Sequence, residues 1–220
     1  MKGTSHKILQ KIQDKTNMDE LVSDVLAEPH HVEILVETLR HERSALKFGC
    51  EKVLRLVSEQ KPELIYPYFD FFVALISSEN SFLRWGAIRT LANLVSVDAE
   101  RRFDKVFSKY FSNITGGDMV SAANAIGSSP KIAQARPELA DRIVHEILKL
   151  EGATYLHKGR VSPECKNVVR GAAVGAFEAI YPIAESRPSI ARFLREQTEN
   201  PRTKVRASAR KVLGKLNIER

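Results

Sequence analysis

A six-position pattern that returns at nearly constant spacing constrains this chain more than any other feature. In each copy an apolar residue precedes a basic one, two small residues follow, and two more apolar residues complete the string. The basic positions are Lys47, Arg84, Arg170 and Arg206, which are separated by 37, 86 and 36 residues. The second small residue and the two later apolar residues are spaced i, i+4 and i+7, so they share one helix face. The pattern therefore predicts four equivalent helices.

The gap of 86 residues predicts one more copy. A step of 36 from Arg84 reaches Val120, which is followed by small residues but is not itself basic. Gly127 and Pro130 occupy its later apolar positions, so we expect this helix to be degenerate and to end early. The next step, to Arg170, is 50 residues long. The surplus matches "EGATYLHKGRVSPE", whose glycines and proline predict an inserted loop near 151–163.

A partner helix is predicted between successive copies, at roughly 30–40, 62–77, 98–114, 137–150 and 187–198. The strings "QKPEL", "ARPEL" and "SRPSI" each place a proline after a basic residue and before an apolar run. Proline is tolerated in the first turn of a helix, where its missing N–H has no partner in any case. Two helices in each unit of about 36 residues is the layout of an α-solenoid.

The repeated string resembles the second helix of HEAT repeats. "NPRTKVRASARKVLGKL" (200–216) matches best, and "NSFLRWGAIRTLANLV" (80–95) follows closely. The resemblance covers roughly residues 30–216 and implies an all-α, right-handed α-α solenoid of about five HEAT-like helix pairs. Residues 1–29 are predicted to form N-terminal capping helices, continuous with the repeats of 30–220 in one domain. HEAT repeats often carry an aspartate in the turn before the basic residue, and here the turns hold Glu42, Asn80, Glu164 and Asn200, so a partial ladder is expected.

The composition fits a protein of the cytoplasm. The net charge is +7, from 34 basic and 27 acidic residues, which permits an acidic partner without requiring one. The two cysteines form no pair motif, the N-terminus has no apolar core typical of a signal peptide, and no apolar run approaches the ~20 residues of a membrane span. We therefore expect a cytoplasmic protein without a membrane partner.

The sequence predicts no catalytic residue, no metal and no cofactor. It has neither a phosphate-binding loop nor an HExxH string. His30 and His31 are interpreted as the start of a helix after Pro29, and Cys50 as a small core residue. The leading hypothesis is a non-enzymatic scaffold that binds an acidic protein or peptide on the concave face of the solenoid.

The candidate binding residues follow from the repeat positions and from the inserted loop. Lys52, Arg89 and Lys211 occupy the same repeat position and, with the basic residues of the pattern, would form two partly basic columns. Arg206 is interpreted as structural, and Trp85 as either a binding anchor or a packing residue. The candidate residues are Lys47, Lys52, Arg84, Trp85, Arg89, His157, Lys158, Arg160, Arg170, Arg210 and Lys211.

Three alternatives stay open at this point. The basic columns could be a solvated face that binds nothing. The chain could bind nucleic acid, and small HEAT-like DNA glycosylases of the alkylpurine type resemble it in size and net charge. Their chemistry is associated with tryptophans, an aspartate and an arginine in a cleft, whereas this chain has one tryptophan and no aspartate that we can match. An adaptor or lyase role of the bilin-lyase type has no specific support.

Overall fold

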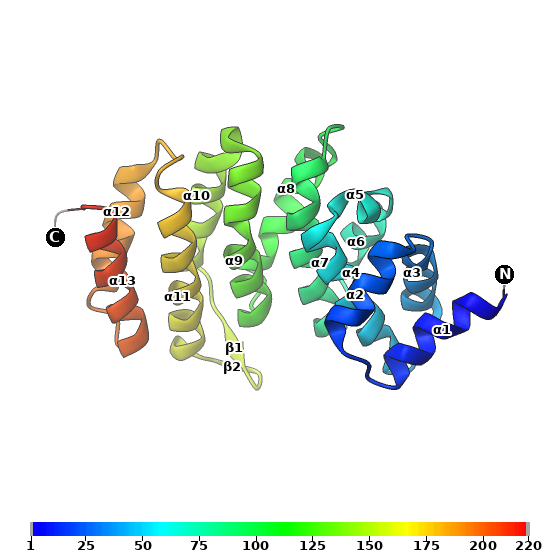
Figure 1. Ribbon diagram of the computed structural model, residues 1–220. Coiled ribbons are helices and arrows are strands. Elements are labelled where there is room, and N and C mark those ends of the chain that lie inside the picture. Colours follow the sequence, from blue (N-terminus) through cyan, green and yellow to red (C-terminus); the bar gives the residue numbers. More distant parts are fainter. Residues whose placement is uncertain (1, 219–220) are drawn as a thin grey trace. The chain divides into compact units, whose positions relative to one another are not determined.

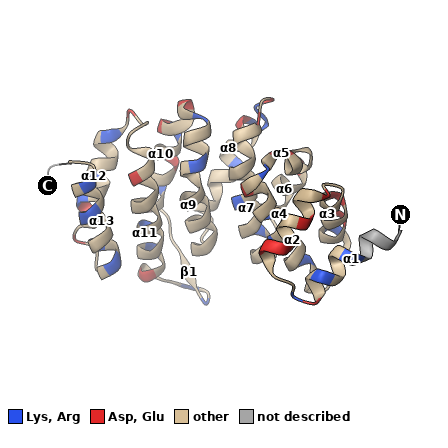
Figure 2. Ribbon diagram, viewed as in Figure 1, with Lys and Arg blue, Asp and Glu red and all other residues tan. Residues whose placement is uncertain are grey.

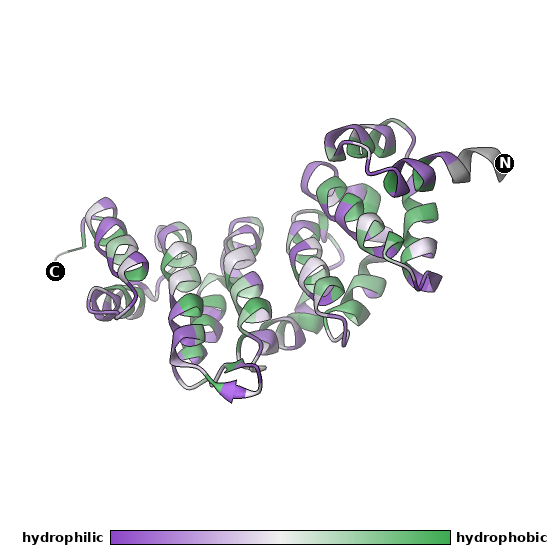
Figure 3. Cartoon of the chain, turned by 90° about the horizontal axis from the view of Figure 1, so that it is seen from below, coloured by the Kyte–Doolittle hydropathy of each residue, from purple (hydrophilic) through white to green (hydrophobic). Residues whose placement is uncertain are grey.

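The computed structural model describes residues 2–218, and the side chains of residues 7–218. Its contacts divide the chain into two compact units, residues 1–100 and 101–220, and each is described by itself. Both are built from successive α-helices (Figure 1). Within each unit the hydrophobic residues lie along the helices, and the connecting turns are largely hydrophilic (Figure 3). No helix in the described part of the chain is long and apolar enough to cross a membrane.

The first unit stacks two repeats behind a pair of N-terminal helices. Helix α4 packs against α3 on one side and α7 on the other, and α1 and α2 cover the remaining flank of α4. Ile8 of α1 and Val25 of α2 are buried in that contact region, as capping helices require. The elements are α1 (Lys2–Gln13), α2 (Met18–Ala27), α3 (His31–His41), α4 (Leu46–Gln60), α5 (Pro62–Ile65), the 3₁₀ turn η1 (Tyr66–Tyr68), α6 (Phe69–Leu75), α7 (Ser81–Leu94) and η2 (Val95–Val97).

The second unit stacks three repeats. Helix α11 packs against α9 and α13, the equivalent helices of the neighbouring repeats, and α12 packs against α13. The elements are α8 (Arg102–Phe111), η3 (Ser112–Ile114), α9 (Met119–Ala135), η4 (Pro137–Leu139), α10 (Ala140–Leu148), η5 (Lys149–Glu151), β1 (Leu156–His157), β2 (Arg160–Val161), α11 (Pro163–Ile180), α12 (Arg187–Gln197) and α13 (Thr203–Lys215). With the first unit this gives the predicted succession of about five helix pairs, so the all-α repeat fold is confirmed. The prediction that residues 30–220 and the cap form one domain stays a prediction.

Helix α9 corrects one expectation, because it does not end early. It runs unbroken through Gly127 and Pro130 to Ala135. Proline cannot donate to the carbonyl four residues before it, which is that of Ile126. The hydroxyl group of Ser129 donates to this carbonyl at 2.7 Å instead, so the helix continues without an orphaned acceptor.

The inserted segment is more ordered than a loop. Leu156 pairs with Val161 and His157 with Arg160 in a two-residue antiparallel hairpin. Lys158 and Gly159 both have positive φ, as a tight two-residue hairpin turn requires. Strand β1 lies against the turn before α9, where the Leu156 amide donates to the Gly117 carbonyl at 3.1 Å.

Candidate binding surface

The basic residue of the repeat pattern fastens the turn that precedes its own helix. Nη1 of Arg84 donates to the carbonyl of Ser78 at 2.5 Å, and Nη1 of Arg206 donates to the carbonyl of Asn200 at 2.8 Å. In both cases the acceptor lies six residues before the arginine. The second guanidinium nitrogen donates to the hydroxyl group three residues before it, that of Ser81 or Thr203. The geometry supports a structural role for Arg206 and gives Arg84 the same role.

The other two basic residues of the pattern make different contacts. Arg170 forms a forked ion pair with Glu151 and donates to Oδ1 of Asn167 at 3.3 Å. The hydrogen bond to Glu151 raises the pKa of Arg170. Lys47 places its ammonium group 5.3 Å from the ring centre of Phe48, a cation–π contact. The charge of Arg170 is thus paired within the fold, whereas Lys47 keeps its positive charge beside an aromatic ring.

Five residues after the basic residue of the pattern, both repeats of the first unit have an exposed cation. Lys52 of α4 and Arg89 of α7 lie on neighbouring packed helices, and Arg89 approaches Glu59 only at 3.8 Å. In the second unit the same repeat position holds Ala125, Gly175 and Lys211. The predicted column is therefore a basic pair in the first unit and a single lysine in the second. Figure 2 shows acidic and basic positions mixed on the helices of both units.

An aromatic cluster on α4 and α7 joins the predicted candidate Trp85 to two rings that the sequence interpretation missed. We call Phe48, Phe82 and Trp85 the aromatic pad. The ring of Phe82 lies 5.7 Å from that of Phe48 and 5.3 Å from that of Trp85, centre to centre. Phe82 is 66% exposed, and the other two are half-buried. The signal was present in the sequence, since Phe48 and Trp85 each directly follow the basic residue of their repeat.

The basic pair lies one helical turn beyond the aromatic pad. Lys52 is four residues after Phe48, and Arg89 is four residues after Trp85, so each cation shares a helix face with an aromatic residue. Phe82 lies three residues before Trp85, which continues the same stripe toward the start of α7. Aromatic surface and positive charge therefore adjoin on two packed helices of the first unit.

A buried carboxyl group lies between the same two helices. Glu51 is 91% buried, and loss of solvation raises its pKa to about 7. A Cβ atom on Gly86 of α7 would come within 1.8 Å of its Oε1 atom, so the glycine makes room for the carboxyl group. Nε of Arg55 lies 3.7 Å from Oε1 of Glu51. Charge at this position is thus supported by one weak ion pair and by the nearby cations Arg89 and Lys52, which only partly offset the loss of solvation.

The hairpin presents its candidate residues at an exposed edge. His157, Lys158 and Arg160 are all exposed, and the structure brings them together at the turn. The cross-strand pair Leu156 and Val161 is also exposed, at 50% and 68%. None of these residues belongs to the first unit, which carries the aromatic pad.

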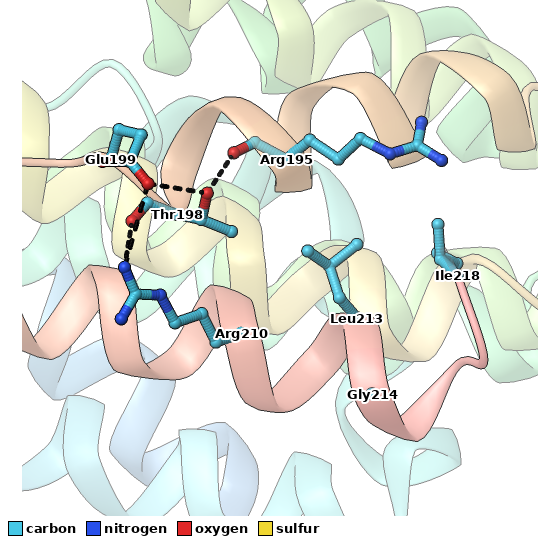
Figure 4. A pocket seen from close by; sticks show the side chains of 7 residues that line it. All are labelled: Arg195, Thr198, Glu199, Arg210, Leu213, Gly214 and Ile218. Carbon is cyan, nitrogen blue, oxygen red and sulfur yellow. Dashed lines mark hydrogen bonds and ion pairs between the residues drawn. The ribbon is translucent and has the colours of Figure 1, made fainter. Parts of the chain in front are cut away.

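Arg210 lines a cavity between α12 and the end of α13 (Figure 4). The cavity has a volume of about 400 Å³, and Arg195 extends above Leu213 toward Ile218. Nη2 of Arg210 donates to the carbonyl of Thr198 at 3.2 Å and lies 3.8 Å from Glu199. Arg210 thus connects the two last helices, and its charge already faces a carboxylate.

Solved structures show what kind of fold this is. A chain of the Pds5–Scc1 complex superimposes with a TM-score of 0.60 at 19% identity over 87% of this chain, which spans 30% of that chain's length. A designed armadillo repeat protein gives a TM-score of 0.59 at 14% identity, covering 97% of this chain and 93% of its own. A second designed armadillo repeat protein, in complex with the peptide (KR)4, gives a TM-score of 0.56 at 13% identity. The match covers 97% of this chain and 91% of that one.

No protein-family model matches the sequence, and no curated protein matches it. The likeness to these solved structures shows the fold, an α-solenoid of stacked helical repeats. At these identities it carries the fold alone.

Proposed function

We propose that this protein is a non-enzymatic scaffold that binds an acidic protein segment through the aromatic pad and the basic pair of its first unit. The single observation that carries the proposal is the exposure of Phe82, which is 66% accessible although two aromatic rings flank it. Clustered exposed aromatic side chains are frequent anchors of protein interfaces, because they bury large areas at low entropic cost.

Charge complementarity selects the partner's chemistry. Lys52 and Arg89 adjoin the pad, and Lys47 lies over the ring of Phe48. A segment with an apolar or aromatic side chain for the pad and carboxylates one helical turn away would match both features. The (KR)4 peptide bound by the designed armadillo protein is basic, so the partner proposed here has the opposite charge. A cytoplasmic location stays a prediction.

Nucleic-acid binding is the less favoured function, because α13 uses much of its basic charge within the chain. Arg202 pairs with Glu164, and Lys215 pairs with Glu178 at 2.5 Å. Arg206 donates to backbone carbonyls of its own turn. DNA binding and base excision remain predictions of the alternative hypothesis, and DNA binding is one outcome of the test below.

The sole tryptophan makes the test direct, since Trp85 belongs to the pad and its fluorescence reports on that site alone. The probes are an acidic peptide of alternating Asp and Glu with one central phenylalanine, the same peptide with alanine there, (KR)4 and duplex DNA. We expect saturable binding of the phenylalanine peptide, with a change in tryptophan emission and weakening by salt.

Matched variants locate the site. Phe82→Ala should weaken binding of the phenylalanine peptide about tenfold or more. Arg89→Glu should weaken this binding too. Two control variants in the second unit should not: Val161→Ala removes a similarly exposed apolar residue, and Lys211→Glu replaces the cation at the repeat position of Arg89. Unchanged affinity in Phe82→Ala, no binding of the acidic peptide, or tighter binding of (KR)4 or duplex DNA would refute the proposal.

A further inference from the structure

The turn between α2 and α3 collects three side chains that are common metal ligands. Glu28, His30 and His31 each offer one ligand atom, and these three atoms all lie within 4.8 Å of one another. The two imidazole rings are 4.4 Å apart, centre to centre, and Nε2 of His30 lies 3.9 Å from the Glu28 carboxylate. The sequence "EPHH" gave no reason to expect a site, because it also fits an ordinary helix start.

His31 is the second and independent observation. His31 is only 5% exposed, and neither nitrogen of its ring has a hydrogen-bond partner in the described part of the chain. A neutral imidazole has one N–H donor and one acceptor nitrogen, and buried polar atoms in folded proteins nearly always have partners. One of these unpartnered nitrogens belongs to the group of ligand atoms. We therefore expect a ligand that binds an unpartnered ring nitrogen of His31.

The backbone of the turn is fixed, whereas two of its ligands can move. The Glu28 amide donates to the Asp24 carbonyl, and the His31 amide donates to the Glu28 carbonyl, both at 3.0 Å. The side chains of His30 and Glu28 are 53% and 56% exposed. Ligand atoms around a tetrahedral ion with bonds of 2.0–2.1 Å lie ~3.3 Å apart. Rotation of these two exposed side chains toward the buried imidazole would supply that contraction.

The geometry points to a binding site for a divalent transition-metal ion of the zinc type, with Glu28, His30 and His31 as ligands. Two imidazoles and one carboxylate suit Zn²⁺ rather than Mg²⁺ or Ca²⁺, which prefer oxygen ligands. The positive end of the α3 dipole disfavours a cation here, and the Glu28 carboxylate offsets that effect. A bound ion would link the end of α2 to the start of α3. This site shares no residue with the aromatic pad.

The test uses the 220-residue chain without a histidine tag, treated with a chelator and then titrated with Zn²⁺ by calorimetry. We expect one equivalent to bind, with a rise in the unfolding temperature that grows with Zn²⁺ concentration. Mg²⁺ and Ca²⁺ at the same concentrations should give neither heat nor stabilisation.

Exposed ligands provide variants that keep the core intact. His30→Ala and Glu28→Gln should each lower the Zn²⁺ affinity about tenfold or more. The control is His41→Ala, because His41 lies 3.3 Å from Glu37 at the other end of α3 and forms an exposed histidine–carboxylate pair with no third ligand among the described side chains. Its loss should leave the affinity unchanged. The inference is wrong if Zn²⁺ does not saturate the protein, or if it binds His30→Ala and Glu28→Gln as tightly as the original chain.

Discussion

Replacing Glu51 by glutamine should make the protein more stable at alkaline pH and change it little in acid. Glu51 is 91% buried between α4 and α7, and burial raises its pKa from 4.5 to about 7. The neutral carboxyl group is thus preferred in the folded state, while an unfolded chain ionises it near pH 4.5. Above that pH the unfolded state holds fewer protons than the folded state, so stability falls as the pH rises.

The size of the effect follows from the two pKa values. A difference of about 2.5 between the folded and unfolded pKa corresponds to about 3 kcal/mol in total. The loss begins near pH 4.5 and is complete above pH 7. Between pH 5 and pH 8 the free energy of unfolding should therefore fall by about 2 to 3 kcal/mol through this one group. Glutamine has nearly the same shape and cannot ionise, so Glu51→Gln should remove that slope.

Urea unfolding of both proteins at several pH values from 5 to 8 provides the measurement. The difference between the two stabilities isolates Glu51, because every other ionisable group is present in both proteins. Glu59→Gln is the control, since Glu59 pairs with the same Arg55 at 3.3 Å but is far more accessible. Parallel stability curves for Glu51→Gln and the original chain would show that the buried carboxyl group does not set the pH dependence.

Three further predictions concern packing and buried chemistry. Ala87 is fully buried, so Ala87→Leu should overpack the core and cost about 1–3 kcal/mol, measured as a lower unfolding temperature, whereas Ala207→Leu at an exposed position should not. Arg206→Ala should cost about 1 kcal/mol in urea unfolding by releasing the Asn200 carbonyl, and an unchanged midpoint would contradict its structural role. Burial raises the pKa of the Cys50 thiol to about 12, so alkylation of the folded protein at pH 8 should spare Cys50, and mass spectrometry can check this.

Most of the fold could be predicted because it depends on apolar periodicity. The pattern around Arg84 and Arg206 fixed which helix faces are buried, and both helices form where the pattern places them. The end of α9 could not be predicted, because the carbonyl that Pro130 leaves without a backbone donor is satisfied by the hydroxyl group of Ser129. The propensity rules treat Pro130 as a helix stop and contain no information about that bond.

The candidate site was predicted less well, for a different reason. Lys52 and Arg89 were found from their repeat position, and the structure leaves both exposed. Phe82 was missed because an aromatic residue at the start of an amphipathic helix usually joins the core, and nothing in the spacing shows that it faces outward. The cluster at His31 was missed because whether a histidine finds a hydrogen-bond partner depends on the three-dimensional contacts of its ring.

The inserted hairpin supplies a hydrogen bond that the incomplete repeat at α9 lacks. Arg84 and Arg206 each donate to the carbonyl six residues before them. In the incomplete copy the basic position is Val120, and the carbonyl six residues before it is that of Ile114. The hydroxyl group of Tyr155, at the base of the hairpin, donates to that same carbonyl at 2.7 Å. The extra residues therefore supply the hydrogen bond that the missing arginine would have made.

Tyr155→Phe tests whether the hairpin replaces the missing arginine. The residue is 1% exposed and phenylalanine keeps its packing, so the change removes only the bond to the Ile114 carbonyl. The loss should be about 1 kcal/mol or somewhat more, because the acceptor stays buried. Val120→Arg, made in the Tyr155→Phe background, should recover part of that loss in urea unfolding, since it restores the donor that Arg84 and Arg206 provide in their repeats. Full stability in Tyr155→Phe, or no recovery in the double variant, would mean that the hairpin does not replace the missing arginine.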